Sequence, residues 1–236
     1  MKCNAASHDA PPPAGIIRLE NLFPSLVVFP HPAKARRDGL LAVGGDLLPG
    51  TLIRAYARGI FPWSVSPITW WSPDPRAIFE IGTFELPKRM QRYERTGRFE
   101  ITFDRSFRDV IEACAEPGPG REDTWISEEF VVAYTRLHHL GIAHSVEARI
   151  DGRLVGGAYG VALGGFFAGE SMFHRVSNAS TIALAALMRR LRERGFALFD
   201  TQVLTNHTRM LGAIELPRTA YLERLRGALA LACEFP

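Results

Sequence analysis

The stretch LVGGAYGVALGGFFAGESMF, residues 154–173, decides the fold. It contains two apolar runs separated by Gly164-Gly165, and two such runs joined by a glycine pair are typical of a β-hairpin. Strand signals in HSVEARI, residues 144–150, come just before it and end in an Asp151-Gly152 turn. The three segments therefore predict consecutive antiparallel strands.

A helix, a strand and a second helix are expected after the hairpin. Ser177 and Asn178 are suited to cap a helix that Gly195 ends, the run at 196–204 predicts a buried strand, and residues 218–231 predict the last helix. The order strand, hairpin, helix, strand, helix predicts a mixed sheet with helices packed on it. This order also occurs in the acetyltransferase-like (GNAT-like) fold.

The N-terminal part has a different texture. Residues 16–76 are dense in proline and glycine and hold three of the four tryptophans, which predicts a turn-rich unit with short strands. Longer, more regular elements follow. We therefore expect an α+β protein with a flexible leader over residues 1–20, a small N-terminal αβ domain over 21–78 and a catalytic domain over 79–236.

The charge balance is nearly even. The chain has 28 Lys+Arg against 25 Asp+Glu, a net charge of +3, which is too small to imply a polyanionic partner unless the charges cluster. One cluster is expected on a helix over residues 87–95. That helix would present Lys88, Arg92 and Arg95 on one face, with Arg89 beside them.

Cysteine usage and hydropathy restrict the class of protein further. The three cysteines form neither a CxxC pair nor an even set, which argues against a zinc site or a disulfide framework and favours a reducing cytoplasm. No run of about 18 uncharged apolar residues occurs, so no membrane span is expected.

Common catalytic signatures are incomplete. The string GESMF at 169–173 begins like a nucleophile elbow, but Phe173 replaces the second glycine of that motif. The histidines show no HxH or HExxH spacing, which argues against a catalytic metal. The segment FHRVSNAST at 173–181 lacks the glycines with which an acetyltransferase holds the coenzyme A pyrophosphate.

Polar residues on apolar strands are the remaining candidates. Asp200 and Gln202 interrupt the run at 196–204, and a spacing of two predicts that both side chains lie on one face of the sheet. Burying a carboxylate is costly unless hydrogen bonds compensate, so Asp200 either satisfies local backbone groups or belongs to a site. Glu170, near the end of the hairpin, raises the same alternatives.

Six strings in this order resemble the leucyl/phenylalanyl-tRNA protein transferases. They are GLLAVGGD at 39–46, RGIFPW at 58–63, WWSPDPR at 70–76, TWI at 124–126, GESMF at 169–173 and DTQ at 200–202. The resemblance implies an enzyme without metal or coenzyme A that moves Leu, Phe or Met from aminoacyl-tRNA to an N-terminal Arg or Lys of a protein. The resemblance further implies that this transfer would mark the acceptor protein for degradation.

The resemblance also implies roles for individual residues. Asp200 would orient and help deprotonate the attacking amine, Gln202 would hydrogen-bond Asp200 and the reacting centre, and Glu170 would hold the acceptor's basic side chain. The aminoacyl pocket would be formed by Ala158, Phe167, Leu184, Leu187 and Phe199. The terminal adenosine of the tRNA would lie against Trp63, Trp125 and Thr205, and the tRNA backbone against Lys88, Arg89, Arg92 and Arg95.

Two other functions stay open at this point. One is a coenzyme A-dependent N-acyltransferase of the same fold, which the glycine-free segment argues against. The other is a non-catalytic tRNA-binding module. In each case we expect a monomer that does not bind a membrane.

Overall fold

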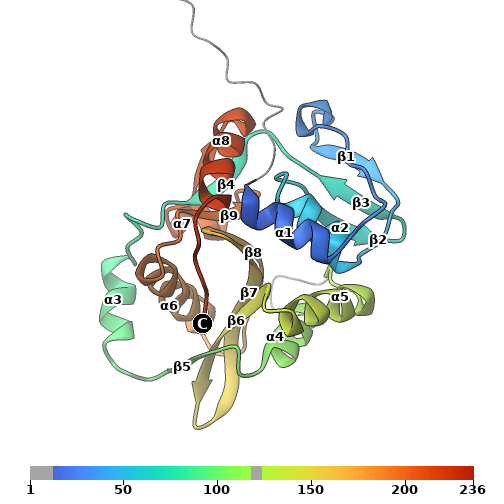
Figure 1. The fold of residues 1–236 in the computed structure, drawn as a ribbon. Helices are drawn as coiled ribbons and strands as arrows, with labels where there is room; N and C mark the ends of the chain where they lie inside the picture. Colours follow the sequence, from blue (N-terminus) through green and yellow to red (C-terminus); the bar gives the residue numbers. More distant parts are fainter. Residues whose placement is uncertain (1–12, 118–123) are drawn as a thin grey trace, which may run out of the picture.

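A seven-stranded mixed sheet forms the centre of the molecule (Figure 1). A computed structural model describes residues 13–117 and 124–236. The strand order is β10-β4-β9-β8-β7-β6-β5, and all neighbours are antiparallel except β8 and β9. In chain order the strands are β4 Arg76–Phe79, β5 Glu100–Phe103, β6 Ala143–Ile150, β7 Arg153–Leu163, β8 Phe166–His174, β9 Leu198–Gln202 and β10 Ile214–Leu216.

Helices cover both faces of this sheet. α6 (Ala179–Glu193) packs on one face, against β6 and β7, and its Ala183 and Leu187 belong to one buried cluster with apolar residues of these strands. α4 (Phe107–Ala115) and α5 (Glu128–His139) pack on the other face, with α8 (Arg218–Leu229) beside β8 and β9. Two shorter helices are α3 (Lys88–Glu94), which lies at the periphery (Figure 1), and α7 (Asn206–Met210), which follows β9.

A second, smaller sheet is built from the N-terminal residues. Its order is β1-β3-β2, with β1 Leu40–Val43, β2 Phe61–Val65 and β3 Ile68–Trp71. The helices α1 (Ala14–Leu22) and α2 (Pro49–Tyr56) pack beside it, and a short 3-10 turn covers Pro32–Lys34. Trp70 is fully buried and donates its indole N–H to the Gly44 carbonyl at 2.8 Å, which anchors this sheet to the loop after β1.

The apolar core continues from the small sheet into the large one. Tyr56 of α2 and Phe130 and Tyr134 of α5 belong to one buried cluster. The boundary expected at residue 78 falls inside β4, which lies between β10 and β9 in the large sheet. The division into domains over 21–78 and 79–236 therefore stays a prediction, and the apolar core is continuous across this boundary.

The expected leader is helical in its second part. Residues 1–12 lie outside the described residues, but residues 14–20 belong to α1, where Ile16 is 1% exposed and Glu20 pairs with Arg58 at 2.6 Å. For these residues the expectation of a flexible leader is wrong, because an apolar side chain and an ion pair hold the helix against α2.

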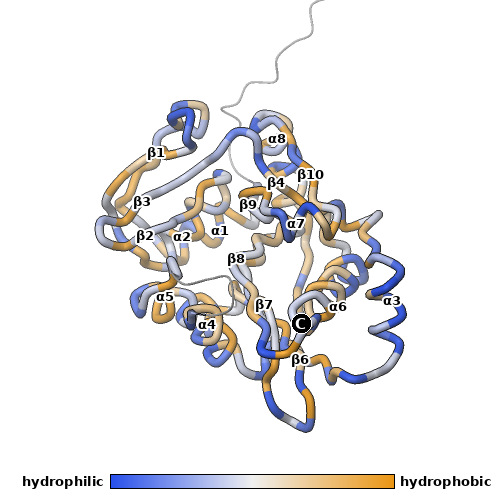
Figure 2. Tube along the Cα trace, turned by 180° about the vertical axis from the view of Figure 1, so that it is seen from behind, coloured by the Kyte–Doolittle hydropathy of each residue, from blue (hydrophilic) through white to orange (hydrophobic). Residues whose placement is uncertain are grey.

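The mixed α+β fold and both hairpins are confirmed. β6 turns into β7 at Asp151-Gly152, and β7 turns into β8 at Gly164-Gly165. Figure 2 shows that apolar segments line the interior, whereas α3 is mostly hydrophilic. Among the described residues no helix is both long and apolar enough to cross a membrane.

Candidate active site

The site forms where β8 and β9 separate. These two parallel strands pair only over residues 166–168 and 198–200. A register shift against β4 follows, and Gln202 adopts a left-handed conformation with φ 65°, which turns the chain away from β8 toward α7. A cavity of about 270 Å³ opens in the resulting gap.

The floor of the cavity is apolar. It is lined by Phe79, Ala158, Met172, Leu184, Leu187 and Phe199. Four of the five residues expected to form the aminoacyl pocket are therefore brought together. The fifth, Phe167, does not line the cavity: it packs behind Phe199 with a ring separation of 5.5 Å and stacks on Phe235 at 5.7 Å.

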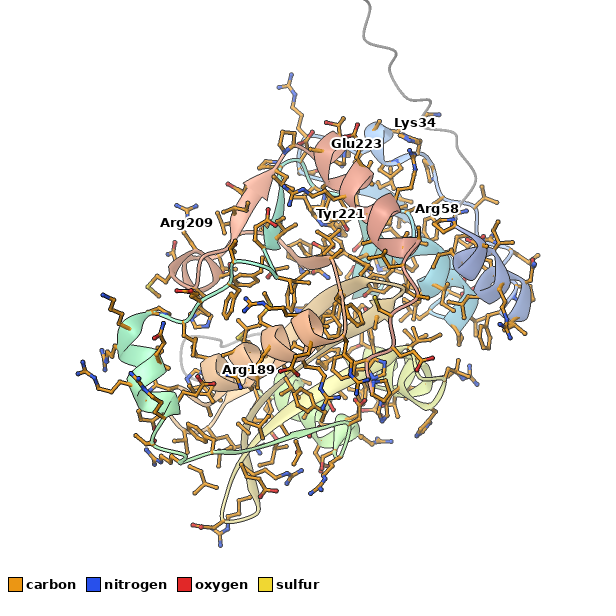
Figure 3. The ribbon with its side chains drawn as sticks, turned by 60° about the vertical axis from the view of Figure 1, so that its left-hand side comes forward. Lys34, Arg58, Arg189, Arg209, Tyr221 and Glu223 are labelled. Carbon is orange, nitrogen blue, oxygen red and sulfur yellow. The ribbon has the colours of Figure 1, made fainter. Side chains whose placement is uncertain are left out.

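Asp200 is sealed away from this cavity. Its side chain is 0% exposed and forms a bidentate ion pair with buried Arg76, with Nε–Oδ1 2.9 Å and Nη2–Oδ2 2.6 Å. Tyr221 donates to the same carboxylate at 2.8 Å. Figure 3 shows Tyr221 directed inward from α8. The expectation that Asp200 faces the attacking amine is therefore wrong, because its carboxylate oxygens point to Arg76 and Tyr221.

Gln202 does line the cavity, but it does not share a face with Asp200. Its backbone N–H donates to Asp200 Oδ1 at 2.8 Å, and its side-chain Nε2 donates to Glu170 Oε1 at 3.0 Å. The alternation expected for a strand fails here because a bulge and a left-handed residue intervene. Gln202 thus makes the hydrogen bond expected with Asp200, but through its backbone N–H, and this bond fixes the turn that directs the Gln202 side chain to Glu170.

Glu170 is the carboxylate that faces the cavity. It is 9% exposed, and Tyr134 donates its hydroxyl to Oε2 at 3.2 Å. The hydroxyls of Tyr56 and Tyr134 are hydrogen-bonded to each other. Burial raises the pKa of Glu170 to about 7, and the nearby polar groups of Tyr56, Gln202 and Tyr134 oppose this rise. At neutral pH this group can therefore both accept and release a proton.

Aromatic and polar residues form the rim of the cavity. Trp63 is 39% exposed and lies 5.3 Å from Trp71 in an edge-on arrangement. Trp125 lies on the same rim and packs against Phe130. Thr205 caps α7 by accepting from the Thr208 N–H at 3.1 Å. The rim thus brings together the three residues expected to contact an adenosine.

Comparisons with known proteins agree on one family. The model of the leucyl/phenylalanyl-tRNA protein transferase family matches residues 78–226, and the model of that family's N-terminal domain matches residues 45–74. A leucyl/phenylalanyl-tRNA--protein transferase of Nitratidesulfovibrio vulgaris (strain DP4) is 51% identical over 90% of this chain and 92% of its own. The chain belongs to this family. The transferase of Syntrophotalea carbinolica is 50% identical over 86% of this chain and 89% of its own.

Likeness among solved structures is weaker than these matches. The structure described as L-PGS from Bacillus licheniformis has a TM-score of 0.39 and 16% identity, and it covers 62% of this chain. The chain spans about half of that protein's length (47%). A likeness at this level carries no argument about function.

The basic helix of this leucyl/phenylalanyl-tRNA protein transferase family member lies apart from the cavity. Lys88, Arg89, Arg92 and Arg95 are all exposed on or next to α3, and none of them lines the cavity. α3 is held to α6 by an ion pair between Glu94 and Arg189 at 2.5 Å. Within the described ranges, no group of three or more His, Cys, Asp or Glu is placed to hold a metal ion.

Two tyrosines near Glu170 were not among the site residues expected from the sequence of this transferase family member. Tyr56 and Tyr134 fall on the buried stripes of α2 and α5, where both are at most 1% exposed. A buried tyrosine needs a hydrogen-bond partner for its hydroxyl, so a tyrosine on the buried stripe of each helix could have indicated a polar network. Phe79 was missed because nothing in a short apolar strand shows which side chain reaches a cavity.

The raised pKa of Glu170 predicts how stability depends on pH. The folded state keeps this proton up to about pH 7, whereas the unfolded chain loses it near pH 4.3, so this group destabilises the fold as pH rises between these values. The effect is on the order of 3 kcal/mol. Glu170→Gln should therefore raise the Tm relative to the parent by more at pH 8 than at pH 4.5. A Tm difference that is independent of pH would contradict the assignment.

Proposed function

We propose that the protein transfers leucine, phenylalanine or methionine from aminoacyl-tRNA to the α-amino group of an N-terminal Arg or Lys of an acceptor protein. Such transfer would mark the acceptor for degradation. The observation that carries the proposal is the apolar cavity, which holds one carboxylate among its described lining residues, Glu170, with the Gln202 amide at its edge. The names of the family and of its relatives support the coarser part of this proposal, transfer from leucyl- or phenylalanyl-tRNA to protein.

The reaction needs alignment and a proton acceptor. The amine nitrogen attacks the ester carbonyl carbon, the ester C–O bond breaks, and the ribose oxygen leaves and takes up a proton. An α-amino group has a pKa of about 7.7–8.0, so part of it is already neutral at pH 7. Holding the two reactants together can contribute roughly 7–11 kcal/mol to lowering the barrier.

Glu170 is the residue best suited to accept the amine's proton. Its pKa of about 7 is close to that of the α-ammonium group, which favours proton transfer between them. Gln202 donates its amide N–H to Glu170, which leaves its carbonyl oxygen to accept a hydrogen bond from the amine. Glu170 therefore takes the proton-accepting role that the resemblance implied for Asp200, and its implied role as an anchor for the acceptor's basic side chain is secondary.

Discrimination among donors follows from the cavity floor. Leu, Phe and Met side chains can be buried against Ala158, Leu187 and Phe199, whereas a charged side chain would lose its hydration against these three apolar residues. Hydrophobic pockets discriminate by only about 1–3 kcal/mol per methylene, so acceptance of several apolar donors is expected.

The basic face of α3 is proposed to bind tRNA phosphates. Its four exposed cations would contribute to the affinity for tRNA, and this contribution would weaken as the salt concentration rises. This surface is separate from the cavity, as expected if the body of the tRNA contacts α3 while its 3′ end enters the cavity.

Trp63→Ala is expected to raise the KM for Leu-tRNA by about 5-fold to 150-fold, since stacking of a base on an aromatic ring contributes roughly 1–3 kcal/mol. The KM for the acceptor peptide should stay within about twofold, and Trp63→Phe should recover most of the loss. Steady-state kinetics with each substrate varied in turn measures both values. An equal rise in both KM values would argue against stacking.

The direct test uses radiolabelled Leu-tRNA and a peptide that begins with Arg. We expect label in the peptide, and no label when its α-amino group is acetylated, because the nucleophile is then lost. Replacing Leu-tRNA with acetyl-coenzyme A should give no product. Binding of charged tRNA without any transfer would overturn the proposal in favour of a non-catalytic tRNA-binding module.

A further inference from the structure

Three phenylalanine rings lie in series behind the cavity floor. Phe199 lines the cavity, and its ring centre lies 5.5 Å from that of Phe167. The Phe167 ring in turn lies 5.7 Å from the ring of Phe235, at an interplanar angle of 24°. All three side chains are at most 3% exposed. A change at Phe235 can therefore reach the cavity floor through Phe167, although Phe235 itself does not line the cavity.

Glycines on the neighbouring strands make room for two of these rings. A Cβ atom added at Gly160 of β7 would lie 2.5 Å from the Phe167 ring, and one added at Gly169 of β8 would lie 2.8 Å from the Phe199 ring. Both distances are well below the optimal carbon–carbon separation of about 3.5–4.0 Å. The two rings therefore lie directly against the strand backbone, which leaves Phe167 little freedom to move toward β7.

Phe235 lies beyond the last helix, in a segment without helix or strand. Of residues 230–236 it alone is buried. His144 of β6 stacks on its ring at 4.3 Å, Phe103 of β5 lies 6.0 Å away, and Arg190 of α6 donates to its carbonyl oxygen at 3.2 Å. Figure 1 shows the segment after α8 returning beside α6. This segment therefore joins the core through one aromatic side chain.

The wall behind Phe235 is itself held in place. His144 is 3% exposed, and its Nδ1 lies 2.7 Å from Asp104 Oδ2. Phe235 thus fills the space between the fixed ring of His144 and the ring of Phe167. Because buried side chains are close-packed, the size of the side chain at position 235 determines how far Phe167 stands from this wall.

We propose that Phe235 is a positioning residue that sets the depth of the aminoacyl pocket and thereby the choice among apolar donors. This inference rests on the proposed function. A smaller side chain at position 235 lets Phe167, and with it Phe199, move back, which deepens the cavity and favours the longer phenylalanine donor over leucine. A larger side chain at this position pushes both rings toward the cavity and has the opposite effect.

The test measures donor choice by direct competition. Equal concentrations of Leu-tRNA and Phe-tRNA are supplied together with a peptide that begins with Arg, and the two peptide products are quantified by mass spectrometry at low conversion. Both donors compete for the same enzyme molecules, so the product ratio equals the ratio of the two kcat/KM values. This ratio does not depend on the fraction of a variant that is folded, so a merely structural role of Phe235 would leave it unchanged.

Phe235→Ala is expected to shift the product ratio toward phenylalanine by about threefold to tenfold, less than the roughly 10-fold to 200-fold effect of a methylene group in direct contact with the substrate. Phe235→Leu should shift the ratio in the same direction but by less, and Phe235→Trp should shift it toward leucine. An unchanged ratio in the alanine and leucine variants would overturn the inference. A shift toward phenylalanine in the tryptophan variant as well would also overturn it.

Phe166→Ala is the matched control. Phe166 precedes Phe167 on β8 and is 0% exposed, but it points to the opposite face of the sheet and belongs to the other buried cluster. Its replacement removes the same side chain from the core but leaves the row of three rings intact, so the product ratio should stay within about twofold of the parent. A shift equal to that of Phe235→Ala would show that any disturbance of the core alters donor choice, and it would overturn the inference.

These outcomes are separable from failure of the proposed function. If the parent enzyme forms neither peptide product, the proposed function itself fails. If it does form product, the competition ratio decides the inference. Phe235→Leu leaves less space empty than Phe235→Ala, so it decides the inference even when the alanine variant does not fold, as judged by circular dichroism.

Discussion

Glu170→Gln is expected to lower kcat for peptide labelling by about 10²-fold to 10⁴-fold, the range typical of removing a group that transfers a proton. The amide keeps the size of the carboxyl group and can still accept the Tyr134 hydrogen bond, but it cannot take the proton of an ammonium group. The KM for Leu-tRNA should change little, because the variant leaves the apolar floor and the rim intact. Single-turnover labelling with preformed enzyme and Leu-tRNA measures this step.

A pH profile distinguishes loss of the proton acceptor from loss of alignment. The rate of the parent should rise as pH increases through about 7, where Glu170 loses its proton, whereas the Gln variant should keep only the rise at about pH 7.7–8.0 that the α-amino group of the peptide itself produces. Tyr134→Phe is a useful control, since the Tyr134 hydrogen bond lowers the pKa of Glu170. Removing it should move the rise to higher pH. A Glu170→Gln enzyme with the parental rate and pH profile would exclude Glu170 as the acceptor.

Asp200→Asn is expected to lower the free energy of unfolding by about 3–5 kcal/mol, because it leaves the buried guanidinium of Arg76 without a counter-charge. Arg76 is 1% exposed and lies between the rings of Phe61 and Tyr221, so water cannot replace the lost carboxylate. Urea denaturation followed by circular dichroism measures the change. Activity should fall as well, since Asp200 Oδ1 holds the turn that positions Gln202.

A double variant provides the control for this prediction. Removing both charges with Arg76→Met and Asp200→Leu should recover part of the stability lost in Asp200→Leu alone, since no unpaired charge stays buried. If Asp200→Asn were as stable as the parent yet at least a hundredfold slower, Asp200 would act directly on the substrates, as the family resemblance implied.

The sequence predicts local structure well where each signal lies within a few residues. The Gly164-Gly165 turn and the apolar stripe of α6 are examples, since each is complete within its own segment. The expected cap of α6 failed: Asn178 precedes the helix in a left-handed conformation and makes no side-chain hydrogen bond to it. The backbone conformation of Asn178, which the residue types do not reveal, determines that its side chain does not cap α6.

The residues of the site could be predicted, but their contacts could not. Asp200 and Gln202 stood out as polar residues in an apolar run, yet the partner that determines the state of Asp200 is Arg76, 124 positions away. Likewise, the hydroxyls near Glu170 come from α2 and α5. Which long-range partner a buried charge finds depends on the packing of the whole sheet, and the period-two rule at 200–202 failed because one bulge reverses it.

The residues that hold Glu170 and Asp200 in place come from both parts of the chain, which limits how the protein can be cut into separate domains. Tyr56 comes from the N-terminal helix α2 and Arg76 from the first residue of β4, yet both reach groups on β8 and β9. The larger sheet therefore cannot be moved to another protein with its site intact, because a gene fragment encoding only residues 79–236 would lack both side chains. Recombination that exchanges the two halves between distant relatives would have to preserve Tyr56 and Arg76 together with their partners.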